Sequence, residues 1–156
     1  RCTKEWEGIA LNCVKCIKFE ADKIIKKYVN ELGYLDPMLI VKNLKRVHFS
    51  IEPLSDSVNG FYNYISPNKQ MIIINSNLSE EEFNFTLFHE LGHYFLGHKD
   101  KLLLNSSFTM NLKEEYQADL FATYMYINFK NIDYLDNETL FPKRVSELKE
   151  KISNML

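Results

Sequence analysis

The sequence lacks long hydrophobic runs and blocks of basic residues. No apolar stretch approaches the roughly 18 residues that a membrane-spanning helix needs, so we expect no membrane-embedded segment. Lys and Arg number 19 against 21 Asp and Glu, which gives a formal net charge of −2. Because no cluster of Lys or Arg provides an electrostatic footprint for nucleic acid, we expect no direct binding to DNA or RNA. Internal repeats and low-complexity segments are also absent.

Cysteine is scarce, with Cys2, Cys13 and Cys16 as the only three. An odd number of cysteines without a secretory signal is typical of proteins in a reducing compartment. The segment Arg1–Trp6 lacks the pattern of a signal peptide, so we expect a cytoplasmic protein. It begins without Met, as a fragment or a processed chain does. Cys13 and Cys16 form a CxxC motif, but a structural zinc site needs two more ligands, so we interpret both as ordinary helix positions.

The hydrophobic content is that of one folded domain. Of the 156 residues, 46% are hydrophobic and 26% are charged, which allows a core without disulfides. We expect a single domain over residues 1–156, with its core at about 17–130 and a C-terminal helix at about 142–155.

Hydrophobic periodicity predicts helices, then a small sheet, then more helices. The order predicts an α+β fold in which a small antiparallel sheet of three strands packs with several helices. The last two strands are expected to form a hairpin. The expected helices span 17–32, 37–44, 79–97, 111–127 and 142–155, and the expected strands span 47–51, 61–65 and 71–74.

Helix boundaries are indicated by capping residues. Gly33 and Gly97 provide C-terminal stops, and Asp36 followed by Pro predicts the start of the second helix. Ser79 and Asn111 each precede a Glu by three positions, the spacing of an N-terminal capping box.

The run His89-Glu90-Leu91-Gly92-His93 lies on one of these predicted helices. Residues four apart stack one turn apart on the same face, so the two imidazoles can bind one zinc ion. Glu90 lies about 100° around the helix from His89, where it can reach a water molecule beside the metal. The pattern therefore separates two metal ligands from one acid/base residue.

The alternative interpretation is a solvated helix face that carries two unrelated histidines. Gly92 argues against it, because Gly inside a helix costs about 1 kcal/mol relative to Ala. A Gly there is understandable if another backbone approaches closely. On a solvent-exposed helix, a Gly at this position would only destabilise the helix.

A catalytic zinc site needs a third protein ligand, and Glu115 on the next predicted helix is the best candidate. Asp119 lies one turn further, where it could accept a hydrogen bond from the outer nitrogen of a ligand histidine. Ala118 and Ala122 on the same face would let the two helices lie close together. The alternative is an exposed acidic patch at a helix start, which the helix dipole favours.

Taken together, these motifs resemble those of the ImmA/IrrE metallopeptidases. The resemblance rests on the segment 85–93, on 72–75 and 60–62 before it, and on 115–122 after it, and it covers about residues 20–130. It implies a compact zincin fold with His89, His93 and Glu115 as metal ligands and Glu90 as the catalytic acid/base. The chain departs from the family pattern after Ala122, where Thr-Tyr-Met-Tyr replaces a Leu-rich segment that ends in Pro.

The resemblance also implies a biological role. Family members are often encoded by phages and mobile elements, and some cleave a partner DNA-binding repressor. We therefore expect a zinc-dependent endopeptidase whose protein substrate is a helix-turn-helix repressor, with Mn²⁺ as the alternative to Zn²⁺. Two competing hypotheses are a metal-binding module that sequesters a repressor without cleaving it, and a structural helical protein with a chance HExxH.

The sequence leaves several further roles open. Tyr62, Tyr64, Tyr94 and His98 are all candidates to stabilise an oxyanion, and the sequence does not choose among them. His98 follows the helix stop at Gly97, so we expect it to be exposed. His48 alternates with apolar strand residues and is also expected to face solvent. If the apolar strand 71–74 is a sheet edge, a substrate could add to it as an extra strand.

Overall fold

The computed structural model describes residues 13–99, 112–131 and 141–154. The predicted α+β fold is confirmed, and the predicted order of helices, sheet and helices holds. In these ranges the elements are α2 (Cys13–Leu32), α3 (Pro37–Lys42), β1 (Val47–Glu52), β2 (Gly60–Ser66), β3 (Lys69–Asn75), α4 (Glu80–Phe95), α5 (Leu112–Lys130) and α6 (Lys143–Ser153).

The sheet is mixed, and the prediction of an antiparallel sheet is wrong in part. Its strand order is β1-β3-β2, with β2 antiparallel and β1 parallel to β3. The hairpin of β2 and β3 is confirmed, with the two-residue loop Pro67-Asn68 between Ser66 and Lys69. Because β3 is central, the hypothesis that 71–74 forms a sheet edge is also wrong. The apolar run of β3 belongs to a strand that is paired on both edges, with Ile72 and Ile74 buried and Met71 and Ile73 partly buried.

The capping signals act as the sequence predicts. The Asp36 carboxylate accepts a hydrogen bond from the Met38 backbone N–H at 2.8 Å, and Ser79 Oγ accepts one from the Glu82 N–H at 3.3 Å. Gly33 and Gly97 both adopt positive φ just past a helix end, a conformation that Gly reaches without steric cost. The expected cap at residue 111 lies outside the described residues.

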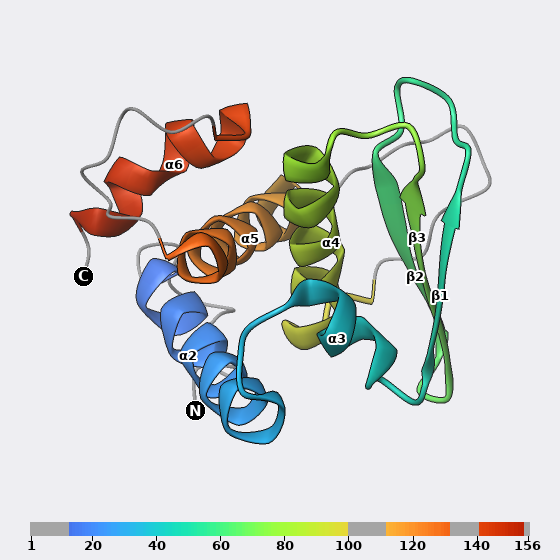
Figure 1. The fold of residues 1–156 in the computed structure, drawn as a ribbon, viewed down its shortest axis with the longest axis horizontal. Coiled ribbons are helices and arrows are strands. Elements are labelled where there is room, and N and C mark those ends of the chain that lie inside the picture. The colour runs from blue at the N-terminus through green and yellow to red at the C-terminus, as the bar shows by residue number, and fades with distance from the viewer. Residues whose placement is uncertain (1–12, 100–111, 132–140, 155–156) are drawn as a thin grey trace.

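Helix α4 lies between the sheet and α5, while α2 and α6 contact α5 (Figure 1). Since α5 touches helices on several sides, every residue from Gln117 to Ile127 except Asp119 is buried. The core is therefore centred on α4 and α5. None of the helices in the described ranges has the length and apolarity to cross a membrane.

Asn75 ties the end of β3 to the loop between β1 and β2. Its side chain is nearly inaccessible, and its amide donates to the carbonyls of Leu54, Ser55 and Val58, the shortest at 2.8 Å. Its Oδ1 accepts hydrogen bonds from the N–H groups of Leu54 and Asn77. Asn75 thereby fixes the backbone just before α4 begins.

Gly92 lies where α4 meets α5. A Cβ built at Gly92 would be 3.0 Å from Phe121 Cδ1 and 3.3 Å from the Ala118 Cα. Both neighbours are fully buried, so neither can move away easily. The close helix approach that the sequence predicts from Gly92 and Ala118 is confirmed.

We predict that Gly92→Val lowers the free energy of unfolding by about 2–3 kcal/mol, because inserting methyl groups into a packed interior forces the helices apart. Urea unfolding of the metal-free chain measures the change. Gly33→Asn is the matched control, since a Cβ at Gly33 meets no atom within 4 Å and Asn tolerates positive φ. If Gly92→Val unfolds at the same urea concentration as the parent, the spacing between α4 and α5 is not fixed by Gly92.

Candidate metal centre

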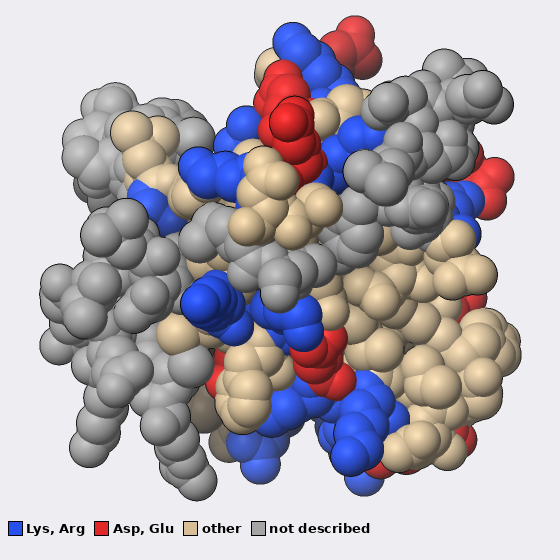
Figure 2. Space-filling model, turned by 90° about the vertical axis from the view of Figure 1, so that its left-hand side faces the viewer, with Lys and Arg blue, Asp and Glu red and all other residues tan. Residues whose placement is uncertain are grey.

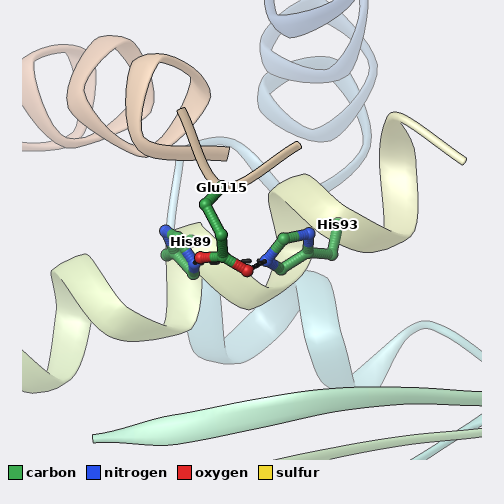
Figure 3. Close-up of side chains that lie close together, drawn as sticks. All are labelled: His89, His93 and Glu115. Carbon is green, nitrogen blue, oxygen red and sulfur yellow. Dashed lines mark hydrogen bonds and ion pairs between the residues drawn. The ribbon is translucent and has the colours of Figure 1, made fainter. Parts of the chain in front are cut away.

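His89 and His93 lie one turn apart on α4 and direct their Nε2 atoms toward the same point (Figure 3). The two Nε2 atoms are 3.2 Å apart, and both side chains are mostly buried. The i, i+4 spacing predicted this arrangement, because residues four apart share a helix face.

Glu115 completes the cluster from the first turn of α5. One of its carboxylate oxygens is 3.0 Å from His89 Nε2, and the other is 3.1 Å from His93 Nε2. One ligand atom from each residue lies within 4.8 Å of the other two. Within the described residues, this is the only group of three or more His, Cys, Asp or Glu side chains close enough to share a metal ion. Cys16 is buried in α2 and is not part of it.

The outer nitrogen of His89 is held by α5. His89 Nδ1 lies 2.8 Å from Asp119 Oδ1, as the sequence predicts for a carboxylate one turn after Glu115. The second oxygen of Asp119 accepts a hydrogen bond from Arg144 Nε of α6 at 2.9 Å. An Nδ1–H that donates to Asp119 leaves the Nε2 lone pair of His89 free for a cation.

The outer nitrogen of His93 is held by a second pair of side chains. His93 Nδ1 lies 2.8 Å from His98 Nδ1, and His98 Nε2 lies 2.8 Å from Gln117 Oε1. If His93 keeps Nε2 free, its Nδ1–H donates to His98, and the His98 Nε2–H donates to the Gln117 oxygen. All these polar groups are thereby paired in one consistent set of tautomers.

The expectation that His98 is exposed is wrong, since the residue is 6% exposed. The reason is the backbone at the end of α4, where Gly97 adopts φ 73°. The His98 N–H bonds to the His93 carbonyl at 3.0 Å and the Gly97 N–H bonds to the Tyr94 carbonyl at 3.3 Å. This is a Schellman motif, which brings the second residue past the helix end back over the last turn. Gly97 carries the signal in the sequence, because a Gly just past a helix end is typical of this motif as well as of a simple stop.

The charges of the cluster favour a cation at its centre. Burial alone would lower the pKa of His89, but the hydrogen bonds with Asp119 and Glu115 outweigh it and raise that pKa to about 10. The hydrogen bonds with His89 and His93 hold the pKa of Glu115 well below its usual range. Two imidazoles and a carboxylate are a donor set suited to Zn²⁺, so the residues fit that ion.

Glu90 is buried, and it lies on α4 next to His89, about 100° further around the helix axis. Burial raises the pKa of its carboxyl group, and the neighbouring His89 and His93 oppose that rise. A raised pKa makes the carboxylate a stronger base, as a residue that accepts a proton requires.

A group of tyrosines lies on the β2 side of His93. The Tyr62 ring stacks on His93 with ring centroids 6.3 Å apart, and its hydroxyl donates to Gln70 Oε1 at 2.6 Å. Burial raises the pKa of Tyr62 to about 12. Tyr62, Tyr64 and Tyr94 line an open pocket of about 350 Å³. His48 is exposed on β1, as expected, and takes no part in the cluster.

Comparison with known proteins agrees with this geometry. Residues 45–141 match the family described as the IrrE N-terminal-like domain, and this segment contains His89, His93 and Glu115. A protein of Bacillus phage phi105, described as "Uncharacterized immunity region protein 2", is 35% identical over 79 residues. The aligned segment covers 49% of this chain and 45% of the phage protein, so the chain spans about half the length of that relative. The family match extends over more than half of the sequence, and the chain therefore belongs to the IrrE N-terminal-like domain family of ImmA/IrrE metallopeptidases.

Proposed function

We propose that this protein is a zinc-dependent endopeptidase of the cytoplasm, with His89, His93 and Glu115 as metal ligands. The observation that carries the proposal is the convergence of three ligand atoms whose supporting groups are already in place. A bound Zn²⁺ would act as a Lewis acid that lowers the pKa of water and polarises the scissile carbonyl.

Glu90 is the proposed catalytic acid/base. Its carboxylate accepts the proton of the attacking water and later delivers that proton to the leaving amine. Its burial supports this role, because the raised pKa brings the carboxyl group closer to the pH at which both transfers must occur. A fully exposed glutamate would be a weaker base and would accept the proton of the water less readily.

The sheet offers a place for the substrate backbone. In the described sheet, β2 pairs only with β3, and β2 is an edge strand that contacts α4. An extended peptide that pairs with the open side of β2 would run beside the helix that carries His89 and His93. This assigns substrate binding to β2 in place of the central strand β3.

The proposed substrate is a helix-turn-helix repressor of a phage or mobile element. Support comes from the similarity to a phage protein whose name places it in an immunity region. Because the chain spans only part of that relative, the partner is inferred from context and family membership. The repressor encoded nearest to the gene of this chain is the first substrate to test.

Zinc should stabilise the fold. A ligand present at about 1,000 times its dissociation constant adds about 4 kcal/mol, which raises Tm by roughly 8–16 °C for a chain of this size. Thermal unfolding after chelator treatment, with and without one equivalent of Zn²⁺, measures the shift. Mn²⁺ should bind more weakly at the same nitrogen and oxygen ligands. A zinc content below about a tenth of an equivalent after purification in excess metal would refute the assignment.

Removing the support of His93 should weaken zinc binding. His98→Phe keeps an aromatic ring but removes the acceptor for His93 Nδ1–H, and we expect zinc affinity to fall about 10–100-fold. Competition with a chromophoric chelator measures the affinity. His48→Phe, on the exposed face of β1, is the matched control and should bind zinc like the parent. Equal affinities for the two variants would show that the His98 contact does not matter.

Glu90→Gln should separate binding from catalysis. We expect the variant to bind one equivalent of zinc and to lose at least about 10²-fold in the rate of repressor cleavage, because Gln cannot carry the proton. Cleavage is followed by mass spectrometry with and without a chelator. Glu80→Gln, an exposed position at the start of α4, is the control and should cleave normally. Full derepression in cells by Glu90→Gln would instead show that the protein acts by sequestering the repressor.

A further inference from the structure

Helix α6 begins after the segment that matches the family. Its buried face is formed by Val145, Leu148 and Ile152, and it contacts α5 on the side where α5 does not face the sheet (Figure 1). Apolar burial of this kind fixes the helix in place. It does not by itself connect α6 with the metal centre.

The connection is made by Arg144 in the first turn of α6. Its Nε donates to Asp119 Oδ2 at 2.9 Å, while Asp119 Oδ1 lies 2.8 Å from His89 Nδ1. Asp119 therefore uses one oxygen for each partner. Arg144 Nη1 also donates to Glu147 Oε2 at 3.0 Å, which orients the guanidinium from its own helix.

Asp119 needs such a partner because of its surroundings. It is the one residue between Gln117 and Ile127 that is not buried, yet its side chain is only 20% exposed. A largely desolvated carboxylate is unfavourable unless charged or polar groups surround it. Hydrogen bonds to both oxygens also restrict rotation of the carboxylate more than a single bond to His89 would.

We propose that Arg144 is a positioning residue of the metal centre, which fixes Asp119 and through it the ring of His89. The inference rests on the proposed role of His89 as a metal ligand. It makes α6 part of the site, although α6 lies outside the family match. A lysine would supply the charge but lacks the planar guanidinium that suits a carboxylate.

The competing view is that Arg144 forms an ordinary surface ion pair. Figure 2 shows the side of the molecule where α2 and α6 lie, and basic and acidic side chains are interspersed there. Surface pairs such as Lys18–Asp22 involve two substantially exposed side chains and typically contribute little. Arg144–Asp119 differs because the carboxylate is mostly buried and its other oxygen holds a proposed ligand.

The test is the zinc affinity of Arg144→Gln in the full chain, measured by chelator competition. We expect the dissociation constant to rise about three- to tenfold, less than the 10–100-fold typical of a group that contacts a ligand directly. Arg144→Lys should recover part of the loss. The matched control is Lys143→Gln, which removes the same charge from the neighbouring, 91% exposed side chain and should leave the affinity within about twofold of the parent.

A double-mutant cycle with Asp119→Ala identifies the route of the effect. If Arg144 acts through Asp119, Arg144→Gln should have no further effect on zinc affinity in the Asp119→Ala background. The visible absorption spectrum of the Co²⁺-substituted chain should also change in Arg144→Gln and stay unchanged in Lys143→Gln, because it reports ligand geometry. Unchanged affinity in Arg144→Gln, or an equal loss in both backgrounds, would overturn the inference.

The outcome is separable from that of the proposed function. If the parent chain binds no zinc, the assignment of the metal ligands fails before Arg144 is considered. If the parent, Lys143→Gln and Arg144→Gln all bind zinc with the same affinity, only the positioning role of Arg144 fails. Because Arg144 is more than one third exposed, its substitution is expected to leave the fold intact, which the unfolding of the metal-free variants checks.

Discussion

Gly92 and Ala118 meet where α4 packs on α5, and the lack of side-chain bulk between them sets how close the two helices lie. The candidate metal centre depends on that spacing, because α4 supplies His89 and His93 while α5 supplies Glu115. From α5, Asp119 contacts the outer nitrogen of His89 directly, and Gln117 contacts His98, which in turn contacts the outer nitrogen of His93. A slightly wider gap would therefore disturb the ligands and their supports together.

Most of the site could be predicted from local signals in the sequence. The i, i+4 spacing of His89 and His93 defines a shared helix face, and the same rule relates Glu115 to Asp119. Gly92, an unfavourable residue inside a helix, correctly indicated a close backbone approach. Caps such as Asp36 and Ser79 act through hydrogen bonds within a few residues, so their geometry follows from the order of residues alone.

The features that sequence reasoning missed depend on contacts between distant segments. The parallel pairing of β1 with β3 is set by where the chain crosses the sheet, which strand periodicity does not encode. His98 turns inward because of the backbone conformation at Gly97, and its Nε2 contacts the side chain of Gln117 on α5. Arg144 reaches Asp119 across 25 positions of sequence, and nothing in the pattern of α6 marks that one basic residue among several.

The position of Glu115 in the first turn of α5 has an electrostatic consequence. The N-terminal end of a helix carries a partial positive charge from its unpaired N–H groups, and this charge stabilises a nearby carboxylate. The helix end thus favours the ionised form of Glu115, as the two imidazoles do. Glu115, the proposed metal ligand, is therefore held in its ionised form by the helix end and by the two imidazoles before any cation binds.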